Sequence, residues 1–420
     1  IDKNRIVPDQ NCFNNNIYTK GIFKKRDVTS VGLFPKFYPD NNRRICILPS
    51  VGWNEYNKWM PGLTIYNKSI PYKKFEYSIS GLYGIADESW AGSGSATYNL
   101  FPKGGLLEYA GIGVIAKRFA FDHTTIRTGE FSYTNPYLHY LRWEPYLEIH
   151  FRRKNARSTV RNRISASMVN VVEEGVELKN RLLNYNITSI ETQSRYIYRL
   201  NFLNYNFRSV DPYGLKLGAE GNSDYQKFHL TAEYKVSYAA KGKGVNFRFF
   251  SGAEVVKNKQ GAYPFNLSAW SGSQDYWYDK YYFGRSENTG LLSQQMSMEE
   301  GGFKTDLPYA SSLDWLTTLN ISFDLPGALP LSVFIDAGTF KGAKDWISAY
   351  GAKGSIIYDG GVCFSTGLVK VYFPIIRSED IKAYQSGDFG IDRIAFGKQI
   401  RFEVDLDKIN PFYIRQQFTR

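Results

Sequence analysis

The sequence predicts an all-β fold, a transmembrane antiparallel β-barrel of about sixteen strands. The clearest evidence lies in residues 313–373, where apolar and polar residues alternate with period two. That pattern is typical of strands with one apolar and one polar face, and Leu316 is its one exception in the first of these strands. The predicted connections alternate between short turns and long loops, which is typical of membrane barrels. Aromatic residues make up 16% of the chain, enough to form aromatic girdles at both membrane interfaces.

Sixteen amphipathic segments follow one another along the chain. They lie at 44–52, 60–68, 75–83, 92–100, 105–119, 147–151, 163–168, 196–202, 227–238, 245–249, 263–271, 313–325, 331–336, 355–364, 369–373 and 400–406. Long loops are predicted at 120–140, 272–311 and 376–394. One connection, 207–224, is long where the alternation predicts a short turn.

The barrel is predicted to occupy residues 43–406. Residues 1–42 are polar and irregular and are expected to be a periplasmic lead-in or linker, with 407–420 as a C-terminal tail. No signal-peptide pattern opens the chain at Ile1, so a mature or trimmed form is expected. The alternative architecture is a soluble β-sandwich. Strands of about nine to eleven residues fit a tilted membrane span better than the usual soluble length of about five or six.

The charge balance is basic, with a formal net charge of +12. Nucleic-acid binding is the usual reason for such a value. Here the basic residues are scattered over the polar faces of strands, as Arg161 and Arg163 are, and do not gather on one helix. We therefore expect a basic lumen or contact with anionic lipid head groups, and no nucleic acid. No run of about eighteen apolar residues is present, which excludes a transmembrane helix.

No catalytic, metal or cofactor site is predicted within these residues. Cys12, Cys46 and Cys363 have no metal-ligand spacing, although a Cys12–Cys46 disulfide is possible. His150 and His229 lie on polar strand faces, as solvated lumen residues would. The glycines of a dinucleotide-like motif at 111–116 lie inside a predicted strand, which is the wrong context for that motif.

Two segments carry a resemblance to a known family. Phe334-Ile335-Asp336-Ala337-Gly338 lies on the predicted thirteenth strand, and Phe283-Gly284-Arg285-Ser286 lies in the long loop before the twelfth. This arrangement resembles the outer-membrane assembly-factor superfamily, which includes BamA, two-partner secretion transporters and bacterial surface antigens. The resemblance implies a long sixth extracellular loop that folds into the lumen, locked there by an arginine on the strand-thirteen aspartate. Arg285 and Asp336 are the residues expected to form this lock, although Gly284 precedes Arg285 where the family has Arg-Gly-aromatic.

A narrower resemblance covers most of the chain. Four segments are similar to segments of outer-membrane barrels of the Bacteroidetes type, namely Trp53 to Lys58, Leu291 to Gln295, Gly301 to Lys304 and Ile409 to Phe412. In those proteins the barrel follows an aminopeptidase-N-like zinc metallopeptidase domain, whose zinc motif is absent from these residues. The expected loop and strand motif residues are Gly284, Gln295, Gly301, Gly302, Phe303, Phe334 and Gly338.

The expected role is that of an outer-membrane anchor or subunit for an accessory domain or protein complex. Its expected partners are outer-membrane lipid and lipopolysaccharide, with further protein subunits or a periplasmic or surface domain. The first alternative is a channel that inserts or translocates proteins through a weak seam between the first and last strands, where Pro49 removes a hydrogen-bond donor. The second is a porin with a basic lumen for small anionic solutes.

Overall fold

The structure is a computed structural model. It describes residues 29–34, 43–69, 72–155, 157–182, 185–238, 242–327, 329–344, 356–386 and 395–406. The predicted lead-in therefore lies outside the described residues except for 29–34, and the predicted tail 407–420 lies outside them entirely. Among the described residues, no helix combines the length and the apolar character needed to cross a membrane.

One large sheet of seventeen strands makes up most of the molecule. All its pairings are antiparallel except that of β1 (Thr29–Gly32), which runs parallel to the start of β2. The other sixteen strands pair in chain order, as the fold prediction requires. They are β2 (Arg43–Asn54), β3 (Lys58–Tyr66), β4 (Phe75–Tyr83), β5 (Trp90–Leu100), β6 (Leu107–His123), β9 (Tyr137–Phe151), β10 (Val160–Leu182), β11 (Tyr185–Asn206), β12 (Tyr213–Gly221), β13 (Tyr225–Ser237), β14 (Gly244–Val256), β17 (Trp315–Asp324), β18 (Leu331–Phe340), β19 (Ile357–Ser365), β20 (Val369–Arg377) and β21 (Arg401–Val404).

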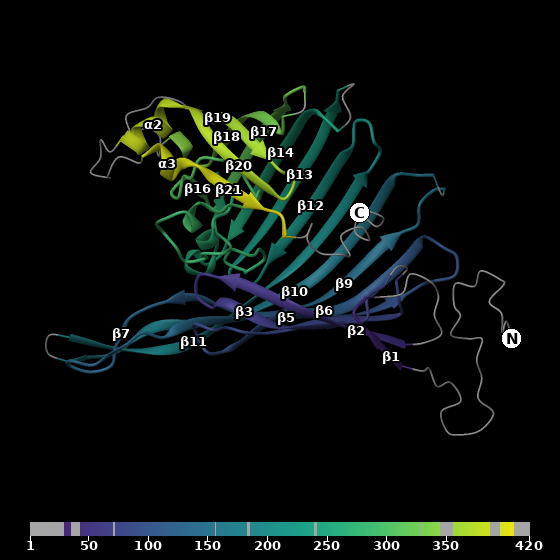
Figure 1. The fold of residues 1–420 in the computed structure, drawn as a ribbon. Coiled ribbons are helices and arrows are strands. Elements are labelled where there is room, and N and C mark those ends of the chain that lie inside the picture. Colours follow the sequence, from purple (N-terminus) through teal and green to yellow (C-terminus); the bar gives the residue numbers. More distant parts are fainter. Residues whose placement is uncertain are drawn as a thin grey trace, which may run out of the picture.

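The sheet curls into a barrel wall around a folded loop (Figure 1). The first strands form the lower wall in this view, β9 to β13 form the back, and β17 to β21 lie at the top. The loop between β14 and β17, residues 257–314, lies inside this wall and is called L6 from here on. The predicted all-β barrel with a lumen-folded sixth loop is confirmed.

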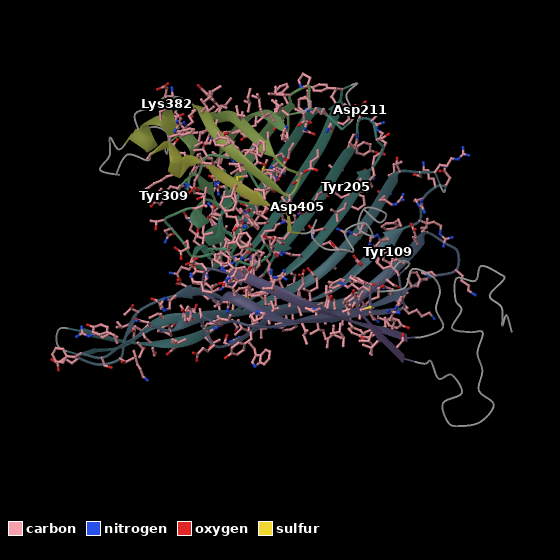
Figure 2. The ribbon with its side chains drawn as sticks, in the orientation of Figure 1. Tyr109, Tyr205, Asp211, Tyr309, Lys382 and Asp405 are labelled. Carbon is pink, nitrogen blue, oxygen red and sulfur yellow. The ribbon has the colours of Figure 1, made fainter. Side chains whose placement is uncertain are left out.

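The two ends of the barrel differ. Connections at one end, here called the turn end, are short, and those at the other, the loop end, include L6 and the two helices α2 (Glu379–Ser386) and α3 (Phe396–Gln399). Tyr309 of L6 and Lys382 of α2 both lie at the loop end, whereas Tyr205 and Asp211 lie toward the turn end (Figure 2). Small two-stranded pairings also occur, β7 (Ile126–Arg127) with β8 (Tyr133–Thr134) and β15 (Phe265–Asn266) with β16 (Ser311–Ser312).

One of the sixteen predicted strands is wrong and one observed strand was not predicted, so the two errors cancel in the count. Residues 263–271 belong to L6, where only the two-residue β15 is a strand. Their alternation arises because Phe265, Leu267 and Ala269 are buried in the loop itself. The missing strand is β12, inside the predicted long connection 207–224. Its three glycines weaken the apolar alternation, and its discovery leaves only short turns on either side.

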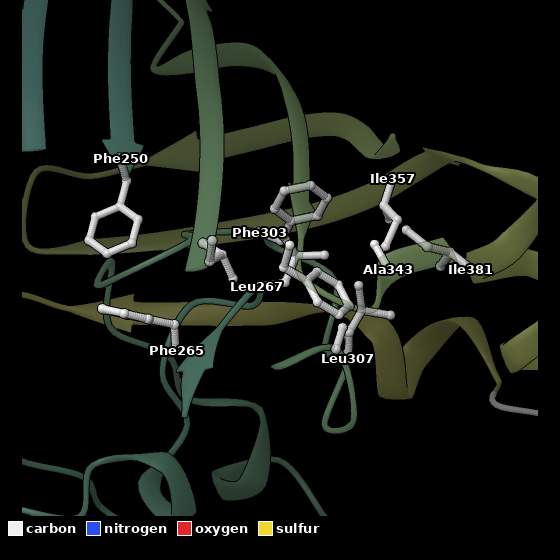
Figure 3. Close-up of a cluster of buried hydrophobic side chains, with 11 residues drawn as sticks. Phe250, Phe265, Leu267, Phe303, Leu307, Ala343, Ile357 and Ile381 are labelled. Atoms are coloured by element: carbon white, nitrogen blue, oxygen red, sulfur yellow. The ribbon is translucent and has the colours of Figure 1, made fainter. Parts of the chain in front are cut away.

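Leu316 interrupts the alternation of β17 because it faces L6. It is fully buried in a cluster with Leu267 and Phe303 of the loop, while Trp315 and Leu319 on the opposite face are exposed. Figure 3 shows the cluster, in which side chains of the loop meet Phe250 of β14, Ile357 of β19 and Ile381 of α2. The barrel interior is thus filled at this end by apolar packing between loop and wall.

Both histidines expected in the lumen face inward. His150 was expected to be solvated but is buried, because it stacks on Tyr109 at a ring-centroid distance of 4.0 Å. His229 stacks near Phe250, a residue of the buried cluster. Cys46 and Cys363 are free, buried thiols, and Cys12 lies outside the described residues. The glycines at 111 and 113 lie within β6, as expected.

Ile197 tests whether packing against L6 stabilises the wall. Its side chain is fully buried in a cluster with Val169, Trp277 and Tyr278. Ile197→Ala should lower the free energy of unfolding in detergent by about 2–5 kcal/mol, through lost burial and a residual cavity. The matched substitution Leu200→Ala, on the exposed outer face of the same strand, should have a clearly smaller effect. Equal effects of the two substitutions would contradict this assignment of faces.

Candidate functional site

The candidate site is the contact between L6 and the inner wall of the barrel. L6 holds very few regular elements, only β15, β16 and three short 3-10 turns at Lys259–Gly261, Gly272–Gln274 and Leu292–Gln294. Its conformation therefore depends on side-chain contacts. Ordering each residue of such a loop costs roughly 1–2 kcal/mol of backbone entropy, which those contacts must offset.

A buried ion pair joins L6 to the thirteenth barrel strand. Lys304 Nζ lies 2.6 Å from Asp336 Oδ1, and both side chains are almost fully buried. Asn320 of β17 donates a second hydrogen bond to the same oxygen, at 3.0 Å. The ammonium group also lies over the ring of Phe334, 5.3 Å from its centroid. A charge-assisted bond of this kind, screened from water, is stronger than a neutral one.

Glycines allow the loop to approach the strand this closely. Gly302 has a φ of +69°, a conformation that favours glycine over other residues. A side chain at Gly301 would collide with the backbone of Leu267. On the strand, a Cβ at Gly338 would lie 2.8 Å from Leu267 Cδ1 and 3.1 Å from the ring of Phe303. These predicted motif residues therefore meet in one place, where Phe303 is fully buried and Gly338 makes room for it.

The predicted pair between Arg285 and Asp336 is wrong. Arg285 instead pairs within L6, with Nη2 3.1 Å from Asp275 Oδ2 and a second bond to the carbonyl of Lys280 at 2.6 Å. Its guanidinium also lies 4.5 Å from the ring centroid of Tyr278. Burial alone would lower the pKa of Arg285, but the Asp275 carboxylate outweighs it and the pKa is raised. Arg285 thus stabilises the internal fold of the loop, and Lys304 takes the role expected of it.

A second set of contacts attaches L6 to the opposite wall. Asp279 Oδ1 lies 2.8 Å from Arg142 Nη2 of β9 and 2.7 Å from Arg199 Nη1 of β11. Burial raises the pKa of Asp279, but the two guanidinium groups outweigh it and hold the pKa below its ordinary value. Lys117 of β6 donates to the Asp279 carbonyl at 3.2 Å. The sequence interpretation missed these residues, although the alternation of β9 and β11 places both arginines on the polar face.

Residues 276–278 of L6, next to Asp279, form two further hydrogen bonds with the wall. Tyr278 donates to Glu173 of β10 at 2.6 Å, and Arg195 of β11 donates to the Tyr276 carbonyl at 2.7 Å. L6 is therefore held by charged and polar groups from both halves of the wall.

Within the loop, Lys280 Nζ lies 2.8 Å from Glu299 Oε1. Burial raises the pKa of Glu299, but Lys280 and other nearby cations outweigh it and lower the pKa to about 2. The Glu299 carboxylate in turn raises the pKa of Lys280.

The remaining motif residues lie in or beside the loop. Gln295 is buried, and its side chain bonds to the earlier segment of L6 around residues 281–283. It accepts from the Phe283 amide and donates to the Tyr281 carbonyl. Gly284 lies in a tight turn in which a Cβ would come within 2.6 Å of Leu292 Cβ. Phe334 is buried beneath Lys304 and packs edge-on against Tyr372 of β20, at 5.8 Å.

Removing Lys304 should destabilise the protein strongly. Lys304→Met leaves Asp336 buried without its counterion, so the free energy of unfolding should fall by about 3–5 kcal/mol. The measurement is urea unfolding in detergent, with limited proteolysis to report whether L6 is released. Lys382→Met is a matched control. Among the described residues Lys382 pairs only with Glu379, on the exposed surface of α2, so the substitution should cost under about 1 kcal/mol.

Asp336→Asn combined with Lys304→Met completes a double-mutant cycle. The combined loss should be smaller than the sum of the single losses, because the second change removes a group already left unpaired. Additive effects would show that Lys304 and Asp336 do not interact.

Glu299 should make stability depend on pH. Its folded pKa of about 2 lies below the value of about 4.3 expected when unfolded. The stabilisation is therefore complete above about pH 4.3 and is lost as the pH falls toward 2. Thermal midpoints measured between pH 5 and pH 2.5 should fall less steeply for Glu299→Gln than for the unmodified protein. Parallel curves would contradict the effect.

Similarity to known proteins is found among solved structures. No family model matches the chain, and no curated protein matches it either. One solved structure that it resembles is BamA from Haemophilus ducreyi lacking POTRA domains 1–3. The two are 10% identical, the match covers 85% of this chain and 69% of that one, and the TM-score is 0.41.

Proposed function

We propose that the chain is an outer-membrane β-barrel that acts as a membrane anchor or subunit for an accessory domain or protein complex. The observation that carries the proposal is the combination of an apolar outer face with a lumen occupied by a locked loop. A membrane anchor requires an apolar outer face and does not require an open pore.

The outer face supports membrane insertion. Large apolar side chains are exposed at alternate positions of neighbouring strands, where a water-soluble protein would place polar groups. They include Leu63, Ile65, Ile79, Ile112, Val114, Leu200, Leu217, Phe228, Phe249, Leu319 and Ile335. Inward neighbours such as Thr318 and Asn320 are polar and buried. Apolar residues outside and polar residues inside are the reverse of the arrangement in a water-soluble protein, and this arrangement suits a surrounding lipid bilayer.

Aromatic side chains border this apolar face at both ends of β4 and β5. Tyr83 and Trp90 are cross-strand partners near the loop end, with ring centroids 5.6 Å apart, and Phe75 pairs with Tyr98 near the turn end. At about 3.3 Å per residue, Phe75 and Tyr83 lie about 26 Å apart along the strand. Strand tilt of about 40° reduces this to about 20 Å in height, comparable to the apolar band of about 25 Å in outer-membrane barrels.

The occupied lumen counts against a porin. L6 contacts the wall from β6 round to β19 through buried ion pairs and an apolar cluster. Steady, anion-selective conductance in planar bilayers would contradict the anchor proposal and favour the porin.

A second candidate function is protein insertion or translocation through the seam between the first and last strands. It is favoured by one observation. Among the described residues no pairing joins β2 to β21, and β21 has only four residues. A weakly paired seam is what that alternative requires.

The decisive experiment is isolation of the protein from its native membrane with mild detergent. Intact mass and N-terminal sequencing should reveal an additional domain, or mass spectrometry of the isolated complex should reveal a stably bound subunit. Isolation of the barrel alone, together with loss of other outer-membrane proteins on its depletion, would favour the insertion function instead. An upstream zinc metallopeptidase domain, which the narrower resemblance implies, would appear in the same mass measurement.

An arginine placed on the lipid-facing surface should be costly. Ile79 lies midway between the two aromatic borders of β4 and is exposed, so Ile79→Arg should destabilise the folded protein in lipid bilayers by about 2–4 kcal/mol. Ser165→Arg is the control, since Ser165 faces the lumen opposite Glu148, where a cation is tolerated. Similar effects of the two substitutions in lipid would contradict membrane insertion of this face.

A further inference from the structure

The two edge strands of the barrel are both bonded to L6 at the loop end. Strand pairing between β2 and β21 is absent from the described part of the chain, and β1 covers only Arg43 to Cys46 of the β2 edge, at the turn end. Figure 1 shows L6, in green, at the level between β21 above and β2 below. The contacts of the loop with each edge explain this position.

One arm of L6, residues 281–286, bonds to the end of β2. The Glu55 amide donates to the Phe283 carbonyl at 2.7 Å, and the Tyr281 hydroxyl donates to the Trp53 carbonyl. The Ser286 amide donates to the Tyr56 hydroxyl at 2.9 Å. The rings of Trp53 and Phe283 also pack at 5.8 Å. This arm is therefore bonded to the loop-end terminus of the first strand and to the turn that follows it.

The other arm, residues 294–296, bonds to β21. The Met296 amide donates to the Phe402 carbonyl at 2.7 Å, and Gln295 forms a parallel β-bridge with Phe402. Gln294 donates to the Gly397 carbonyl of α3, just before the strand, at 2.7 Å. Arg401 donates in return to the Ala269 carbonyl of L6, at 3.2 Å. The outer edge of the last strand is thus occupied by the loop at this end.

Gln295 joins the two arms. Its Oε1 accepts from the Phe283 amide at 2.7 Å and its Nε2 donates to the Tyr281 carbonyl at 2.9 Å. Its own backbone forms the bridge with β21. Because the side chain is 3% exposed, both bonds are shielded from competing water. A continuous chain of contacts therefore runs from β2 through Gln295 to β21.

We propose that L6 closes the barrel wall at the loop end, with the Gln295 side chain as the link between the two edge strands. Between the described residues of β2 and β21, the loop takes the place that direct strand pairing occupies elsewhere in the wall. The edges can then separate at this end only when L6 detaches, so loop and seam open together. This closure of the wall by L6 does not depend on whether the barrel acts as an anchor or inserts proteins.

Hydrogen exchange of the folded barrel in detergent tests the link. In Gln295→Ala, amides at the end of β2 and in β21 should exchange faster together, by roughly tenfold, since both depend on the same local opening. Peptides from β10 to β13 should be unchanged. Ser293→Ala is the matched control, because within the described part of the chain the Ser293 hydroxyl bonds only to the nearby Gly290 carbonyl of the loop.

Gln295→Met separates lost bonding from lost packing, because it keeps the side-chain volume and removes both hydrogen bonds. It should reproduce the faster exchange at both edges. The proposal is overturned if only one edge responds, if neither does, or if Ser293→Ala has the same effect. Migration on unheated gels reports whether a variant is folded. If Gln295→Ala does not migrate as a folded barrel, hydrogen exchange is measured on Gln295→Met instead.

Discussion

The buried pair of Lys304 and Asp336 is the interaction on which the arrangement of L6 depends. A carboxylate with no exposed surface on a barrel strand needs a counterion, and the loop supplies it. Delivering that ammonium group brings Phe303 into the wall and the side chains of Leu267 and Phe303 against Gly338, so one electrostatic requirement determines local packing. The same insertion buries Leu316 and converts an irregular segment into part of the barrel core.

Charge is divided between the two faces in a way that explains how a loop with little regular structure is ordered. The outer face carries apolar side chains, whereas Arg142 of β9 and Arg199 of β11 point inward, where both pair with Asp279 of L6. Charged groups in the low-dielectric interior interact strongly and are costly when unpaired. The opposite walls therefore hold L6 between them, and the loop in turn bonds both edges of the seam.

Much of the candidate site could be predicted from the sequence, but not its central contact. The strand motif of Phe334, Asp336 and Gly338 was expected to hold the sixth loop through Arg285, and the loop residues that lie on it are Phe303 and Lys304. The cation was assigned incorrectly because L6 contains several, and the sequence carries no information on which one reaches Asp336. The turn at Gly301 and Gly302 brings Lys304 to Asp336, while the ion pair with Asp275 holds Arg285 within the loop.

The sequence by itself determined the all-β class and the inward orientation of Asp336, because period-two alternation reports which face of a strand meets apolar surroundings. It failed at β12, where glycines remove the alternating side chains, and at 263–271, where burial inside a loop imitates a strand. Tertiary structure alone decided the ion pairs, the two arms of L6 and the link at Gln295. Those contacts join residues far apart in the chain, and their partners are selected by the curvature of the wall and not by local pattern.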